Sequence, residues 1–138
     1  MNTKFIMTSS ALALGISGIA MTFAPDLIAS ELIPDANSVT QLSIQVIGGL
    51  YFGFAMLNWM VKGSLIGGIY NRPIAVANMT HFMISGLAIF RVVSAYNGLS
   101  VYWWIIGVVY FLLLISFGMI IFTHPLKTGQ SSVDSVKS

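Results

Sequence analysis

Four long apolar stretches divide this chain, and they constrain its fold more than any other feature of the sequence. A helix that crosses a bilayer needs roughly 20 mostly apolar residues, and each stretch reaches that length. Arg91 is the only formally charged residue inside them. The sequence therefore predicts four membrane-spanning helices, at about residues 5–24, 42–61, 73–96 and 99–123.

The composition agrees with a bilayer as the surrounding solvent. The 138 residues are 57% hydrophobic and 7% charged, whereas soluble domains carry about 25% charged residues. The formal net charge of +2 comes from scattered basic residues, which argues against nucleic acid as a partner. The absence of cysteine excludes disulfides, thiol redox chemistry, Cys-ligated zinc and covalent c-type haem.

The first apolar stretch has a second interpretation, as a secretory signal peptide. Lys4 precedes it, and the sequence TFA at 22–24 resembles a small-residue cleavage site. We favour a retained helix, because the stretch is near full spanning length and Pro25 would directly follow the cut.

Basic residues in short loops indicate how such a chain is oriented in the membrane. With four spans, one side collects five of the six basic residues, and the loop 25–40 on the other side is acidic. We therefore expect both termini and the middle loop in the cytoplasm, with the spans in a bacterial inner membrane. The five basic residues are Lys4, Lys62, Arg72, Lys127 and Lys137.

The segments between the spans complete the predicted fold. Apolar pairs at helical spacing in the first loop predict a short interfacial helix, capped by Asp26 and ending before Pro34. Residues 97–98 form a turn dipeptide, so the last two spans pair as a hairpin. The predicted fold is an all-α, antiparallel four-helix membrane bundle over residues 1–126, followed by a polar cytoplasmic tail at 127–138.

Two asparagines lie at matching depth on adjacent predicted spans. Asn58 lies roughly 6 Å from Lys62 along its helix, and Asn78 lies roughly 7.5 Å from Pro73. The simpler interpretation is an amide hydrogen bond between helices, which in membranes contributes about 0.6–2 kcal/mol. The alternative is contact with a substrate.

His81 lies deeper, about 12 Å from Pro73 and near the middle of the membrane. It shares one helix face with Asn78 and Ser85, so this polar stripe is expected to face the interior of the bundle. Ionisable residues inside membranes are candidates for function. Three roles stay open for His81: a structural contact with Tyr51, Tyr110 or a serine, a ligand or proton-relay site, and a cofactor ligand.

The sequence argues against a haem or metal held by histidines alone. The only other histidine, His124, lies roughly 10 Å nearer the cytoplasmic surface than His81, so the two do not oppose each other across a haem. Two histidines also leave a metal ion short of ligands. We predict no cofactor, with haem or quinone not excluded.

Arg91 lies roughly 27 Å along its helix from Pro73, which places it near the outer boundary of the membrane. Its guanidinium group can reach outward toward water. Asp26 and Glu31 are expected on that side, so an ion pair is one interpretation. An anionic ligand or lipid headgroup is the other.

Two further patterns are typical of contacts between helices or with lipid. Gly49 and Gly53 form a small-xxx-small motif, which permits close approach of another helix, either within one bundle or in a homodimer. Lys62 and Arg72 flank the middle loop, where they can contact lipid headgroups or a partner protein.

The stretch IGGLYFGFAMLNWMVKGSLIGGIYNRPIAVANMTHF, at 47–82, and FAPDL, at 23–27, carry a resemblance to a known group. They resemble the DoxX-like small four-helix bacterial membrane proteins and their uncharacterised relatives. The resemblance implies a four-helix membrane fold and a place in redox-linked complexes, and it carries over no catalytic residue. The lack of cysteine, and of acidic residues in the spans, argues against a direct redox or proton-coupled role.

The leading functional hypothesis is a non-enzymatic one. It describes an accessory or structural subunit that packs in the lipid bilayer, as a homo-oligomer or in a larger membrane complex. One alternative is a small transporter or channel that acts as an oligomer with His81 on its path. The other is a cofactor-binding subunit of a redox complex.

Overall fold

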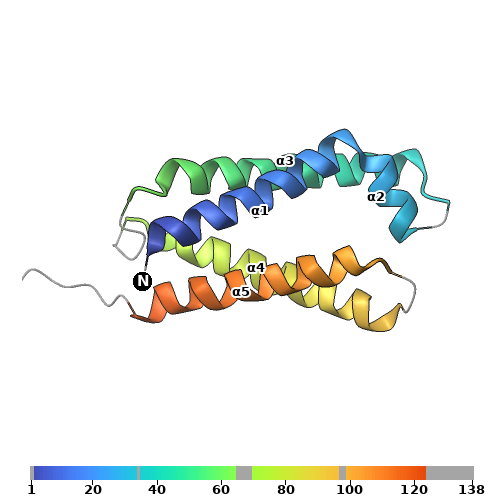
Figure 1. The fold of residues 1–138 in the computed structure, drawn as a ribbon. Helices are drawn as coiled ribbons and strands as arrows, with labels where there is room; N and C mark the ends of the chain where they lie inside the picture. Colours follow the sequence, from blue (N-terminus) through green and yellow to red (C-terminus); the bar gives the residue numbers. More distant parts are fainter. Residues whose placement is uncertain (1, 34, 65–69, 97–98, 124–138) are drawn as a thin grey trace, which may run out of the picture.

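The computed structural model describes residues 2–33, 35–64, 70–96 and 99–123. These residues form helices and no strand, which confirms the all-helical class. The turn predicted at 97–98, the polar tail and His124 lie outside the described residues. The helices are α1 (Thr3–Phe23), α2 (Pro25–Leu32), α3 (Ser38–Val61), α4 (Arg72–Ala95) and α5 (Val101–Thr123) (Figure 1).

Asparagine caps set the starts of two long helices. The Asn2 side chain accepts a hydrogen bond from the backbone N–H of Phe5, and Asn37 accepts one from Thr40. Such caps satisfy backbone donors that have no partner inside the helix. Because of the second cap, α3 begins at Ser38, ahead of the apolar stretch that predicted it at residue 42.

The short helix α2 occupies the first loop and ends at Leu32, before Pro34. The expectation that Asp26 caps it is wrong. Ala24 precedes the helix without a side-chain cap, and Pro25 takes the first helical position, which its fixed φ favours. Asp26 lies instead in the first turn, where a negative charge is favourable beside the helix N-terminus.

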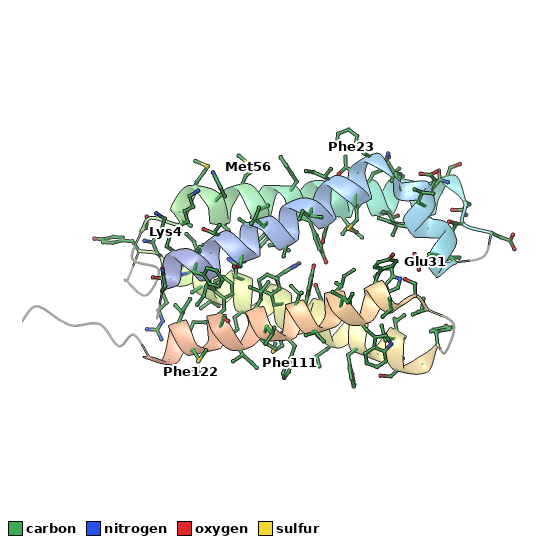
Figure 2. All side chains as sticks on the ribbon, in the orientation of Figure 1. Lys4, Phe23, Glu31, Met56, Phe111 and Phe122 are labelled. Carbon is green, nitrogen blue, oxygen red and sulfur yellow. The ribbon has the colours of Figure 1, made fainter. Side chains whose placement is uncertain are left out.

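The four long helices are apolar enough to cross a membrane, as the sequence predicted. Their outer surfaces carry large apolar side chains, and Figure 2 shows these projecting away from the helices. Phe23 is 82% exposed, Phe122 80% and Met60 77%. Exposed apolar side chains along every long helix are expected for a protein surrounded by lipid rather than by water.

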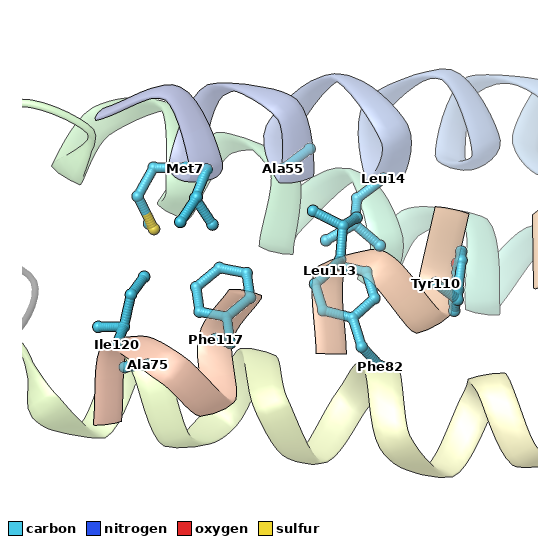
Figure 3. Packing of buried hydrophobic residues seen from close by; sticks show 10 residues of the cluster. Met7, Leu14, Ala55, Ala75, Phe82, Tyr110, Leu113, Phe117 and Ile120 are labelled. Atoms are coloured by element: carbon cyan, nitrogen blue, oxygen red, sulfur yellow. The ribbon is translucent and has the colours of Figure 1, made fainter. Parts of the chain in front are cut away.

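The long helices form two pairs. Figure 1 shows α1 lying along α3, and α4 lying along α5. The short helix α2 lies beyond the C-terminal end of α1. Between the pairs lies a core to which all four long helices contribute (Figure 3). Its fully buried members are Met7, Leu14, Phe82, Phe117 and Ile120.

Glycines bring α1 and α3 into backbone contact. A Cβ atom added at Gly18 would lie 2.7 Å from the Phe52 nitrogen and 2.9 Å from the Gly48 oxygen. One added at Gly48 would lie 2.6 Å from the Thr22 hydroxyl oxygen. No side chain larger than hydrogen fits at either position without moving a helix.

Candidate functional site

The buried polar side chains of the described chain lie in the layer where the two helix pairs meet. Ser10 on α1, Asn58 on α3 and Asn78 on α4 are each fully buried. His81 lies one helical turn beyond Asn78 on α4 and is partly buried. We take this layer as the candidate functional site.

Ser10, Asn58 and Asn78 form a network that we call the amide clasp. Asn58 donates from Nδ2 to the Asn78 Oδ1, at 2.6 Å, and Asn78 donates from Nδ2 to the Asn58 Oδ1, at 2.8 Å. Asn58 also donates to the Ser10 Oγ, at 3.1 Å. The remaining donors point to backbone oxygens: Asn78 donates to Ile74, and Ser10 donates to Met7.

Every hydrogen on the side-chain nitrogen and oxygen atoms of the clasp therefore has an acceptor. This closure matters because a buried donor left without an acceptor costs about 1–3 kcal/mol. The clasp joins α1 and α3 to α4, so it links the two helix pairs. With its donors already used inside the protein, the clasp is a structural link and offers a substrate no free N–H group.

Sequence reasoning identified the two asparagines and missed Ser10. A serine in an apolar helix usually bonds to its own backbone, so it carries little signal. Depth was the available clue. Ser10 lies roughly 9 Å along its helix from Lys4, close to the level of Asn58.

His81 lies next to the clasp in an aromatic surround. Its ring is stacked on Phe54 and meets Tyr51 and Phe82 edge-on. The ring-centroid distances from His81 are 4.9 Å to Tyr51, 5.2 Å to Phe82, 5.5 Å to Phe54 and 5.9 Å to Tyr110.

The Nε2 atom of His81 is buried and has no hydrogen-bond partner among the described residues. The neighbouring tyrosines contact the imidazole through their rings and leave this nitrogen free. Ser85 lies one turn further along α4 and is half-buried. Chemically, the free nitrogen can donate or accept one hydrogen bond, or carry a proton.

The described residues contain no group of three His, Asp or Glu side chains arranged to hold a metal ion. His81 is the histidine that the layer contains.

Arg91 lies on the exposed surface of α4, close to the end of that helix at Ala95. Asp26 and Glu31 lie on α2 at the same end of the molecule (Figure 1). Among the described residues, no ion pair joins Arg91 to either carboxylate. Within the described part of the chain, the guanidinium group is therefore available to bind an anion.

The glycine motif of α3 faces away from α1. A Cβ atom added at Gly49 or Gly53 meets nothing within 4 Å, so these positions form an open surface of the described chain. Close packing within the chain uses the neighbouring Gly48 with Gly18 of α1. A spacing pattern alone could not separate the two sets, since both suit a helix contact.

The two basic residues beside the middle loop have different surroundings. The Lys62 Nζ lies 2.9 Å from the centre of the Trp59 ring, a cation–π contact that fixes the side chain near the end of α3. Arg72 begins α4, and Asn71 precedes it. Both residues lie at the end of the molecule that holds the start of α1 (Figure 1).

Comparisons of the chain with protein-family models, with curated proteins and with solved structures find no match. The DoxX-like resemblance therefore stays a prediction.

Proposed function

We propose that this protein is a small, non-catalytic integral membrane subunit that acts by associating with helices of other chains in the bilayer. The observation that carries the proposal is the closure of the amide clasp. The polar side chains most suited to bind a substrate are used to join the two helix pairs. What the chain offers to its surroundings is an apolar surface.

The association surface that we propose is the open side of α3 around Gly49 and Gly53. An added Cβ atom has free space at both positions, so another helix can approach the α3 backbone there. Small residues at such positions favour helix contacts in membranes because the backbones come close. The partner is a second copy of the chain or a larger membrane complex, with the termini of this chain in the cytoplasm.

Purification from native membranes in a mild detergent tests the proposal. We expect the parent protein to migrate as a homo-oligomer or with a second protein, and the variant Gly49→Leu/Gly53→Leu to migrate alone. Gly118→Leu is the matched control, because Gly118 is also a helical glycine with free space around it. A parent protein that is monomeric and has no companion would overturn the proposal.

A second candidate function is transport by an oligomer, and the free Nε2 atom of His81 favours it. The atom lies between the two helix pairs, where a path through the protein would run. Coupled transporters commonly place an ionisable residue on such a path. Flux into proteoliposomes that is unchanged in His81→Phe would exclude a role for His81 in transport.

A further inference from the structure

A groove of about 500 Å³ runs between α4 and α5. It is lined by apolar side chains and by two glycines, Gly86 and Gly107. Phe82 and Val93 are buried and form its floor, whereas Leu87 and Phe111 on its walls are 64% and 60% exposed. The groove therefore opens to the outside of the molecule, and its volume lies in the range of about 300–1,000 Å³ typical of ligand sites.

The length of the groove matches one leaflet of a bilayer. On α4 it extends from Phe82 to Val93, and on α5 from Trp103 to Leu114. Each stretch corresponds to roughly 16 Å of helix, which is about half of a hydrocarbon core that is about 30 Å thick. One lipid tail occupies one leaflet, so the groove has the length of a single acyl chain.

One end of the groove combines two features of a headgroup site. Trp103 and Trp104 lie there at the start of α5, and amphipathic rings favour the level of the headgroups. Arg91 directly follows the lining residue Phe90 and lies one turn beyond the lining residue Leu87. It is exposed, and among the described residues no carboxylate neutralises it.

We propose that the groove holds an acyl chain of an anionic glycerophospholipid and that Arg91 binds the phosphate-bearing headgroup. The apolar floor and walls accept the chain, the tryptophans lie at headgroup level, and the guanidinium supplies the charge. The inference goes beyond the proposed association of α3, since the groove lies on the other helix pair.

Quenching of tryptophan fluorescence by brominated lipids tests this site directly. The chain has three tryptophans, so a Trp59→Phe background leaves Trp103 and Trp104 as reporters at the groove. The protein is placed in phosphatidylcholine vesicles that contain equal fractions of either brominated phosphatidylglycerol or brominated phosphatidylcholine. We expect the anionic lipid to be preferred about fivefold, as one basic residue near an anionic headgroup provides.

Variants separate the headgroup contact from the chain contact. Arg91→Gln should remove the preference for phosphatidylglycerol, whereas Arg91→Lys and Arg72→Gln should keep it. Gly107→Leu places a side chain in the groove and should lower quenching by both lipids, whereas Gly118→Leu on the same helix should not. Helix content, measured by circular dichroism, identifies any variant that does not fold. If Arg91→Gln does not fold, Arg91→Lys still tests whether a positive charge at this position keeps the preference for phosphatidylglycerol.

Two results would overturn the proposal. Equal quenching by the two brominated lipids in the background protein would mean that the groove meets only bulk lipid. Quenching that falls as protein density in the vesicle rises would mean that a second copy of the chain fills the groove.

Discussion

The two helix pairs use glycine in opposite ways. In the α1/α3 pair, Gly18 and Gly48 face each other's helix, and backbone atoms lie where a Cβ would be. In the α4/α5 pair, a Cβ added at Gly86 or Gly107 would lie 3.6 Å from its nearest neighbour, an ordinary contact. One pair is closed by its glycines, and the other keeps a groove beside them.

Gly18 is so close to α3 that a Cβ atom would overlap backbone atoms of Phe52 and Gly48, whereas Gly86 and Gly107 have room for one. Gly18 meets Gly48, so the two backbones approach. The atoms nearest to Gly86 and Gly107 are side-chain carbons of Tyr110 and Ile89, so the α4 and α5 backbones do not come into contact there. This contrast between the pairs, and the clasp that joins them, can each be tested by substitution.

The first prediction compares one glycine from each pair. Gly18→Ala should lower the free energy of unfolding by up to about 3 kcal/mol, since the new methyl group overlaps backbone atoms that cannot rotate away. Gly107→Ala should instead raise it by about 0.5–1 kcal/mol, because the new methyl group makes only an ordinary contact and alanine is favoured over glycine inside a helix. Unfolding in mixed detergent, followed by circular dichroism, measures both. Equal changes in the free energy of unfolding for the two variants would mean that the two helix pairs are not packed differently at their glycines.

The second prediction concerns the link between the pairs. Asn78→Leu should cost about 2 kcal/mol, because it leaves a buried N–H hydrogen of Asn58 without an acceptor. The double variant Asn58→Leu/Asn78→Leu should recover part of this loss, as both partners are then apolar. The same unfolding measurement, run as a double-mutant cycle, gives the coupling. Additive losses would mean that the two amides act independently.

The third prediction tests the hydrogen bond from Asn58 to Ser10 in the clasp. Ser10→Ala removes one acceptor of Asn58 while the Asn58–Asn78 pair remains, so the expected cost is about 1 kcal/mol. Ser116→Ala is the control, because the exposed Ser116 hydroxyl donates only to the Leu112 oxygen of its own helix. If Ser116→Ala lowers the free energy of unfolding as much as Ser10→Ala does, the effect at Ser10 does not come from the clasp.

The fourth prediction concerns His81, where we expect the smallest change in the free energy of unfolding. His81→Phe replaces the imidazole with another ring in an aromatic surround and removes a nitrogen that has no partner. The free energy of unfolding should rise slightly, by up to about 1 kcal/mol, because a buried polar atom without a partner is unfavourable. A loss above about 1 kcal/mol would show that Nε2 has a partner in the membrane, such as a buried water.

Sequence reasoning predicted the features that depend on composition and periodicity. Long apolar stretches gave the four helices, and the short helix before Pro34 followed from local spacing. The level of a side chain along its helix also follows from sequence, because the rise per residue is constant. Depth therefore suggested Asn58 and Asn78 as partners before any contact was known.

Features that depend on the rotation and separation of helices could not be predicted in this way. Gly48 and Gly49 are adjacent in sequence, yet the structure turns one toward α1 and the other toward open space. The groove beside Gly107 depends on which side chains fill the space between α4 and α5.

Hydropathy and residue spacing are enough to predict helices long and apolar enough for a membrane, and the level of each polar group along them. Three features depend on tertiary packing: Ser10 completes the clasp, the Nε2 atom of His81 has no partner among the described residues, and a groove opens between α4 and α5. The physical reason is that hydropathy and helical rise are properties of one segment. A closed hydrogen-bond network or a groove depends on side chains from several segments packed at fixed rotations.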